Sequence, residues 1–342
     1  MSRLKNNKSL MQALSWIGMI IIAFIIFGIF LLMQGANPLE AYKNMFESTL
    51  TNQIGISKLI LKSVPFILLA VATSISTRAG LVNVGVEGQL MIGMLFTITA
   101  ANFLFTSLPT VLGLILLAIV GMLGGALYGG VAGLFRVKAN MNETITTVVM
   151  NYISYFIVSL AVYGYLRDPE GFNWPMSTQI SDSLTLPKLF GTVNIGIIIA
   201  LLVVALVWYF INKTKTGFKM KVVCGNPNAA KNAGINVNKV RFFAMVATGA
   251  IAGLAGMIEI CGVEGRLRTT TCQDYGYLGF LAAWMAWNNP VLSVATAVII
   301  SFLSVSGNVL EFKNNLPASS TQILMSIVLL AIMWRGKGRK ES

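Results

Sequence analysis

Long apolar stretches, separated by short polar segments containing Pro, Asn and charged residues, follow one another along almost the whole chain. Because a membrane-spanning helix needs about 20 mostly apolar residues, we count about ten spans. Their approximate limits are 14–33, 57–77, 81–103, 109–135, 144–166, 191–211, 242–262, 275–289, 290–309 and 319–334. The pattern therefore predicts an all-α polytopic membrane protein with about ten transmembrane helices.

The first apolar stretch, Leu14 to Met33, follows three basic residues, as the core of a signal peptide does. It is longer than the roughly 7 to 15 residues of such a core, so we interpret it as an uncleaved first span. We expect one transmembrane domain over residues 14–334. A cytoplasmic tail, residues 1–13, precedes it, and a basic cytoplasmic tail, residues 335–342, follows it.

The composition supports a membrane protein and argues against most catalytic classes. Hydrophobic residues fill 56% of the 342 positions and charged residues 11%, whereas about 25% charged residues is usual in soluble domains. The chain has no His, and its three Cys lack metal-binding spacing. We expect a non-catalytic protein without metal or cofactor. Cys261 and Cys272 are interpreted as small apolar fillers, with a disulfide between them as the alternative.

Lysines and arginines are distributed unevenly between alternate loops. Seventeen fall in loops on the side of the N-terminus and six in loops on the other side. Because an excess of Lys and Arg marks the cytoplasmic side, both termini are expected in the cytoplasm. The net charge of +13 then reflects topology, and nucleic-acid binding is not expected, since the sequence offers no basic face with interleaved aromatic residues.

The longest inner segment, residues 212–241, contains seven basic residues and no acid. Its middle predicts a short helix, because Asn226 suits the N-cap, Pro227 the first helical position and Gly234 the C-terminal stop. A helix this short is not stable alone. We therefore expect another surface to pack on it.

Short motifs rich in Gly and Asn occur along the chain in a definite order. They are Ala79–Gln89 (AGLVNVGVEGQ), Gly124–Gly133, Asn142–Thr147 with Asn151 and Tyr152, Gly225–Ile235 (GNPNAAKNAGI), Ala250–Gly256 and Asn288–Pro290. In this order they resemble the permease subunits of ATP-binding cassette (ABC) importers for simple sugars, nucleosides and branched-chain amino acids. The resemblance covers roughly residues 57–335 and is greatest to nucleoside-type members.

The resemblance implies a permease that moves a nucleoside across the bacterial cytoplasmic membrane. The alternative is the same type of importer for a simple sugar or a branched-chain amino acid. It also implies a short coupling helix that docks on a separate ATPase subunit. The positions that match this helix and its flanks are Gly225, Asn226, Ala229, Ala230, Gly234 and Ile235.

The resemblance implies several partners besides the lipid bilayer. The chain has no G-x-x-x-x-G-K-[ST] motif, so the nucleotide must be bound by the ATPase subunit. A second permease subunit, homologous or identical, and an extracytoplasmic substrate-binding protein complete the expected assembly.

Polar residues in a glycine-dense stretch are candidates for the translocation pathway. Asn83, Glu87 and Gln89 lie among four glycines within residues 80–93. Glycines this close together weaken a helix and predict irregular backbone. Inside a membrane, irregular backbone is tolerated only where it lines a cavity or is buried in protein. These side chains are therefore predicted to border the pathway. The alternative is that Glu87 caps a neighbouring helix or ties two spans together.

Further candidates lie in the fifth and eighth predicted spans. Asn142 suits an N-cap, whereas the deeper Asn151 needs a polar partner, which a pathway would supply. Trp284, Trp287 and Asn288 lie in the short eighth span, at a place that broadly corresponds to the interrupted stretch of the first half. Paired interruptions indicate a transport site, and aromatic faces stack on a nucleobase or a sugar. The alternative is that these tryptophans anchor the chain at the membrane interface.

Two other classes of function compete with this interpretation. Ion-coupled secondary transporters usually carry buried acidic or His relays, and here only Glu87 and Glu259 lie well inside apolar runs. A membrane enzyme is less well supported, because the sequence offers no catalytic cluster.

Overall fold

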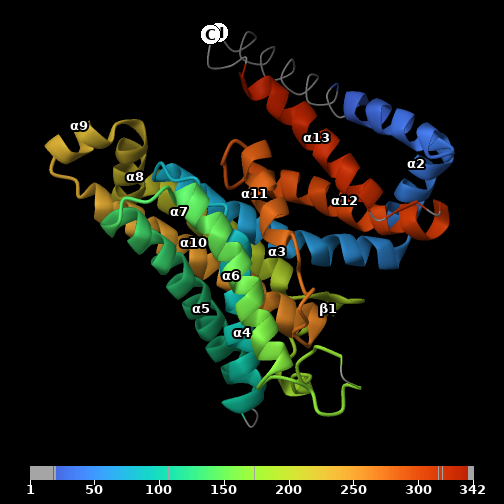
Figure 1. Ribbon diagram of the computed structural model, residues 1–342, viewed down its shortest axis with the longest axis horizontal. Coiled ribbons are helices and arrows are strands. Elements are labelled where there is room, and N and C mark those ends of the chain that lie inside the picture. The colour runs from blue at the N-terminus through green and yellow to red at the C-terminus, as the bar shows by residue number, and fades with distance from the viewer. Residues whose placement is uncertain are drawn as a thin grey trace. The chain divides into compact units, whose positions relative to one another are not determined.

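The computed structural model describes residues 18, 21–105, 108–172, 174–314, 316–317 and 319–337, and they are mostly helical (Figure 1). The helices are α2 (Pro38–Phe46), α3 (Gln53–Arg78), α4 (Val86–Phe103), α5 (Thr110–Lys138), α6 (Glu143–Tyr163), α7 (Gly196–Lys213), α8 (Lys215–Gly225), α9 (Pro227–Asn232), α10 (Val237–Glu259), α11 (Tyr275–Met285), α12 (Leu292–Asn314) and α13 (Ser319–Lys337). Shorter helical segments are η1 (Glu47–Thr51), η2 (Asp182–Leu184) and η3 (Ile260–Glu264). Strands β1 (Lys188–Phe190) and β2 (Val193–Asn194) form an antiparallel hairpin.

The predicted helical class is confirmed for the residues that the structure describes. The predicted tail of residues 1–13 lies outside them, as do residues 338–342 of the other tail. Each of the predicted apolar stretches overlaps a helical segment.

The predicted number of about ten spans is not confirmed. Within the described residues, six helical segments are long and apolar enough to cross a membrane: α3, α5, α6, α7, Val237–Glu264 (α10 with η3) and Leu292–Glu311 of α12. Ile21–Met33 and Ser319–Val328 are shorter apolar helical stretches among the described residues, and α11 has 11 residues. The 18-residue α4 begins with the polar residues Glu87 and Gln89.

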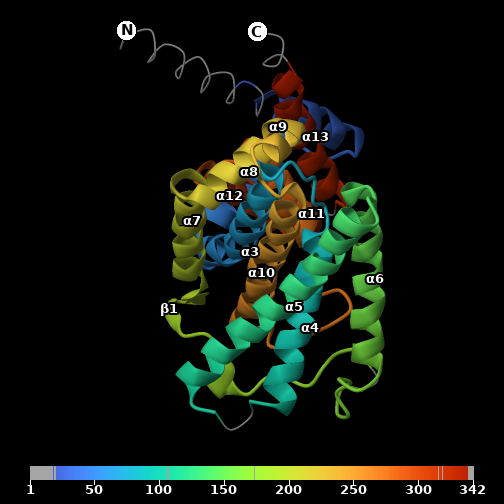
Figure 2. The same ribbon diagram turned by 90° about the vertical axis from the view of Figure 1, so that its left-hand side faces the viewer.

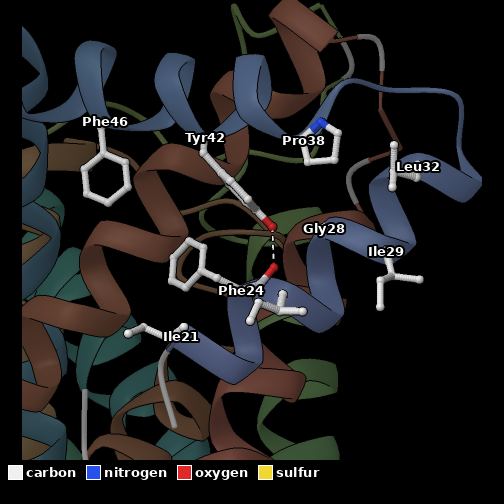
Figure 3. A pocket seen from close by; sticks show the side chains of 9 residues that line it. Ile21, Phe24, Gly28, Ile29, Leu32, Pro38, Tyr42 and Phe46 are labelled. Atoms are coloured by element: carbon white, nitrogen blue, oxygen red, sulfur yellow. Dashed lines mark hydrogen bonds between the residues drawn. The ribbon is translucent and has the colours of Figure 1, made fainter. Parts of the chain in front are cut away.

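The chain divides into two compact units, Met1–Leu59 with Ile299–Ser342, and Ile60–Val298. In the first unit, the Tyr42 hydroxyl donates a hydrogen bond of 2.5 Å to the backbone carbonyl of Phe24 (Figure 3). The hollow beside this bond is lined by Ile21, Phe24, Ile25, Gly28, Ile29, Leu32, Pro38, Tyr42 and Phe46. Its side chains are hydrocarbon apart from the Tyr42 hydroxyl, which is already paired, so the hollow suits lipid better than a polar solute.

In the second unit, α10 lies directly against the backbones of α4 and α5. A methyl group on Gly249 would collide with the carbonyl oxygen of Gly125, and a methyl group on Gly253 with that of Gly121. Gly93 of α4 also faces the backbone of Gly253. Small residues repeated every four positions allow helices in a membrane to approach this closely, and van der Waals contact between backbones then holds the three helices together.

The helical path is interrupted between α3 and α4. Gly80 has a φ of 74°, a conformation that glycine adopts readily, and residues 81–84 are not helical. The predicted irregular backbone is therefore present. It is shorter than expected because α4 begins at Val86, and Gly93 within the predicted irregular stretch is helical.

The two ends of the second unit carry different elements. Figures 1 and 2 both show α8 and α9 at one end and the β1–β2 hairpin at the opposite end. Exposed lysines of the segment that carries α8 and α9 are Lys213, Lys215, Lys219, Lys221, Lys231 and Lys239. This basic end is the one that the loop charges predict to be cytoplasmic.

Two adjacent glycines of α5 test the packing against α10. A methyl group on Gly129 would lie 2.5 Å from the carbonyl oxygen of Met245, whereas one on Gly130 would lie 3.4 Å from Val246 Cγ2. We expect Gly129→Ala to lower the melting temperature, because overpacking costs about 1–3 kcal/mol. Gly130→Ala should preserve or raise it, since Ala favours a helix over Gly by about 1 kcal/mol. Thermal unfolding of the purified protein in detergent measures both, and equal melting temperatures would contradict the packing described here.

Candidate functional site

Glu87, the second residue of α4, is completely buried and joins three separate elements. Its Oε1 accepts hydrogen bonds from the Tyr155 hydroxyl of α6 and, over 2.9 Å, from the backbone N–H of Asp274. Its Oε2 accepts from the backbone N–H of Gly276. Both carboxylate oxygens thus have donors inside the protein, which is the condition for burying a charged group at low cost.

The two backbone donors belong to the beginning of α11. Asp274 is the N-cap residue, but it has a φ of 68° and its own side chain makes no capping hydrogen bond. Glu87, which belongs to α4, supplies the missing acceptor at the start of α11. Its charge also complements the dipole of α11. The alternative interpretation of Glu87, as a cap and a tie between spans, therefore matches the observed contacts. Its place at the border of a pathway stays a prediction.

Asn151 of α6 holds the interrupted segment in place. Its Oδ1 accepts from the N–H of Gly88 at 2.9 Å. Its Nδ2 donates to the carbonyl oxygen of Val84 at 3.1 Å and to the hydroxyl oxygen of Tyr277 at 3.1 Å. Backbone groups at a helix start have no partner within that helix, so Asn151 satisfies groups that would otherwise be unpaired inside the bundle.

Asn83 and Gln89 complete this arrangement. Asn83 Oδ1 accepts from the N–H of Gly85 at 2.9 Å, and Asn83 Nδ2 donates to Gln89 Oε1 at 3.4 Å. The four predicted pathway residues of this region expose 1% of their surface or less. We call the following residues the polar cluster: Asn83, Glu87, Gln89, Asn151, Tyr155 and Tyr277.

The other three predicted pathway residues lie at the far end of α11. Trp284 and Trp287 expose 37% and 43% of their surface, and the Trp284 ring packs on Phe280 with 5.5 Å between centroids. Trp287 and Asn288 have φ values of 49° and 55°, which are unfavourable for large side chains. Asn288 Oδ1 is buried and has no hydrogen-bond partner among the described residues. The 11 residues of α11, about 16 Å of helix, separate these residues from the cap at Glu87.

Sequence reasoning missed Tyr155, Asp274 and Tyr277. Tyr155 lies four residues after Asn151 on the same face of α6, so helical spacing was an available signal. Asp274 and Tyr277 carried no local signal, because only the tertiary fold brings the beginning of α11 to α4 and α6.

A second buried acid, Glu259 of α10, has different surroundings. Its Oε2 lies 3.8 Å from Cys272 Sγ, and Lys62 Nζ lies 5.2 Å from the centroid of the nearby Tyr275 ring. Cys261 and Cys272 are both buried and free. Their burial matches the interpretation of these two cysteines as small apolar fillers.

The short helix predicted in the inner loop is present as α9. Asn226 caps it by accepting from the N–H groups of Asn228 at 3.0 Å and Ala229 at 3.1 Å. Pro227 occupies the first helical position, and Gly234, with a φ of 75°, follows the end of the helix. The predicted start and stop of this helix are confirmed.

The predicted docking residues differ in exposure. Ala230 is fully buried and packs with Val223 of α8 and Val237 of α10, and Ile235 packs against the same core. The exposed members of the predicted set are Gly225, Asn226, Ala229 and Gly234. Ala230 and Ile235 therefore hold α9 on the chain itself, and Ala229 lies on its open side.

Replacing Glu87 tests its role as the cap of α11. Glu87→Ala removes the acceptor of one buried donor, the N–H of Gly276, and of two part-buried donors on Tyr155 and Asp274. A buried donor left unpaired costs about 1–3 kcal/mol. We expect faster amide hydrogen exchange in α11, measured by mass spectrometry on the purified protein, with unchanged exchange in α5. The exposed Glu40 provides the control variant, Glu40→Ala. Wild-type exchange of α11 in Glu87→Ala would rule out the capping role.

Known proteins with similar sequences agree with the resemblance seen in the motifs. Residues 55–333 match the family described as branched-chain amino acid transport system, permease component. The chain is 31% identical over 327 residues to a glucose ABC transporter permease protein of Haloferax volcanii, covering 92% of this chain and 85% of the relative. It is 30% identical over 297 residues to a nucleoside ABC transporter permease protein of Lactococcus lactis, covering 83% and 80%. It is 27% identical over 315 residues to a guanosine ABC transporter permease protein of Bacillus subtilis, covering 88% and 87%. The chain therefore belongs to the family of branched-chain amino acid transport system permease components.

Proposed function

We propose that this chain is the membrane-spanning permease subunit of an ABC importer and that a separate ATPase subunit drives it. The observation that carries the proposal is the construction of α9. This six-residue helix has its own cap, is held on the bundle by the buried Ala230, and leaves Ala229 exposed. A short helix that is anchored on one side and open on the other can receive a push from a docked protein and pass it to the helices beneath.

The basic end that carries α8 and α9 is proposed to face the cytoplasm, where ATP is available. Its segment 212–241 has seven basic residues and no acid, as expected for a cytoplasmic loop. Both termini are then cytoplasmic, residues 14–334 form the transmembrane domain, and the β1–β2 end faces outward. There a substrate-binding protein would deliver the solute, and a second permease, homologous or identical, would complete the pathway in the cytoplasmic membrane of a bacterium.

The polar cluster is proposed to serve the pathway by positioning α11. Its predicted members Asn83, Glu87, Gln89 and Asn151 are fully enclosed and hydrogen-bonded. They therefore have no free surface for a solute in this conformation. Their hydrogen bonds fix the start of α11, and a change in the cluster would move that helix.

Trp284, Trp287 and Asn288 are the residues that we propose to meet the solute. The two indole rings are partly exposed, and Asn288 Oδ1 has no partner among the described residues. A flat aromatic surface suits the π face of a nucleobase. Asn288 Oδ1 is buried, so it would accept from the N–H donors of the base only after a change of conformation exposes it. Relatives named for nucleosides and for guanosine, at 30% and 27% identity, support a nucleoside as the solute.

A simple sugar is the second candidate solute. The relative named as a glucose permease is 31% identical over most of both chains. Sugar rings also stack on aromatic faces, so the exposed tryptophans do not separate the two classes.

A negative charge on the open side of α9 tests the docking of an ATPase. Ala229 in α9 and Asn238 in the first turn of α10 are both exposed. We expect Ala229→Glu to reduce recovery of the ATPase subunit with tagged permease about tenfold, a loss of about 1.4 kcal/mol, and the matched control Asn238→Glu to retain it. Ala230 is unsuitable, because a charge there would disrupt the core of the loop. Equal recovery with both variants would argue against docking at α9.

Competition for uptake tests the solute class. In proteoliposomes that contain the complete importer, uptake of a labelled nucleoside is measured with excess nucleosides, glucose, fructose or leucine. We expect only nucleosides to compete. Trp284→Ala should raise the half-saturating concentration about tenfold, since stacking contributes about 1–3 kcal/mol per base, and Trp208→Ala in α7 serves as the control. No uptake of the labelled nucleoside, together with ATP-driven uptake of labelled glucose or fructose, would favour the second candidate.

A further inference from the structure

The last turn of α8 lies against the turn that follows α3. A Cβ atom on Gly80 would be 3.2 Å from Cys224 Cα, and Cys224 Sγ donates a hydrogen bond of 3.6 Å to the carbonyl oxygen of Thr77. Gly80 also has a φ of 74°, which side chains rarely tolerate. The contact thus requires glycine for two reasons, the available space and the backbone conformation.

Helix α8 enters this contact as part of the same small core as α9. Val223, the neighbour of Cys224, packs with Ala230 of α9 and Val237 of α10. Only Asn226 separates the end of α8 from the start of α9. Because packed interiors deform little, a displacement of α9 carries the last turn of α8 with it.

Beyond Gly80, residues 81–85 form a non-helical strap that leads to the polar cluster. One face of α6 holds the strap by both backbone groups of Val84. The N–H of Val84 donates to Thr147 Oγ1 at 3.3 Å, and its carbonyl oxygen accepts from Asn151 Nδ2 at 3.1 Å. A short strap fixed in this way transmits a displacement instead of absorbing it.

The strap ends two residues before Glu87, and Glu87 holds the start of α11 through the N–H groups of Asp274 and Gly276. A continuous series of contacts therefore runs from α9 through α8, Gly80, the strap and Glu87 to α11. Each of these contacts lies within the second compact unit.

Helix α11 lies between two segments of unusual backbone conformation. It is flanked on both sides by non-glycine residues with positive φ: Cys272 at 55°, Asp274 at 68°, Trp287 at 49° and Asn288 at 55°. Such backbone conformations cost free energy and persist only where surrounding contacts impose them, so they concentrate at elements that switch.

We propose that Gly80 is a positioning residue that joins the movement of α9 to α11 through its close contact with Cys224. The contact acts as a rigid joint and stays closed through the transport cycle. The inference rests on the proposed function, because an ATPase must move α9.

The complete importer in proteoliposomes provides the first test, with the amount of solute taken up per ATP hydrolysed as the readout. Gly80→Ala should lower this ratio about tenfold, within the usual range for coupling between sites, while the ATPase still binds and hydrolyses ATP. Gly35→Ala is the matched control, because Gly35 has a similar φ of 76° but a methyl group there meets nothing within 4 Å, and it should retain the wild-type ratio. A wild-type ratio in Gly80→Ala overturns the inference.

A cross-link separates the joint from a folding defect. A Cβ atom at Gly80 lies 3.8 Å from Cys224 Cβ, which matches the mean spacing of about 3.8 Å in disulfides. Gly80→Cys should therefore form a disulfide with Cys224 on oxidation. The oxidised Gly80→Cys protein should take up more solute per ATP hydrolysed than the same protein when reduced. The double variant Gly80→Cys with Cys224→Ala cannot form the cross-link, so its ratio should not change on oxidation. A lower ratio after cross-linking means that the contact opens during transport, which overturns the rigid joint.

The two proposals fail in different ways. If no ATPase co-purifies and ATP does not drive uptake, the proposed function and this inference both fail. If ATP drives uptake, and Gly80→Ala and Gly80→Cys both take up as much solute per ATP hydrolysed as the wild type, only this inference fails.

Discussion

Backbone N–H and C=O groups inside a membrane protein must find partners within the protein, because lipid offers none. The interruption between α3 and α4 creates such groups, and so does the start of α11. Asn151 of α6 pairs with the groups of Val84 and Gly88, and Glu87 pairs with those of Asp274 and Gly276. The requirement to satisfy these groups thus fixes α4, α6 and α11 relative to one another.

Glycine makes these polar contacts geometrically possible. A methyl group on Gly85 would lie 2.8 Å from Thr147 Cβ, and one on Gly88 would lie 3.0 Å from Asn151 Oδ1. Side chains of α6 can therefore reach the strap and the first turn of α4 only because Gly85 and Gly88 have no Cβ. The same absence of side chains lets α10 approach α4 and α5 along Gly249 and neighbouring glycines. In the motif Ala79–Gln89, the glycines provide room and the polar residues provide hydrogen bonds.

The sequence predicted the local features well and the long-range ones poorly. The caps of α6 and α9, at Asn142 and Asn226, were predictable because capping depends on adjacent residues. Helix positions were also predictable. The number of about ten spans is not confirmed, and hydropathy does not reveal that α11 ends after 11 residues. The two backbone groups that donate to Glu87 lie 187 and 189 positions away along the chain. The sequence therefore indicated only that Glu87 needed hydrogen-bond partners, and did not indicate which groups they were. Ala229 and Ala230 look alike in sequence, and only packing distinguishes the open side of α9 from its buried side.

The central claim is that energy enters this permease from an ATPase that acts on α9. Solute accumulation in proteoliposomes, with permease alone or with the ATPase subunit and the binding protein, tests it most directly. The account predicts accumulation only when the ATPase is present and ATP is supplied on the side that carries α9. Accumulation by the permease alone on a proton or sodium gradient, without ATP, would contradict it.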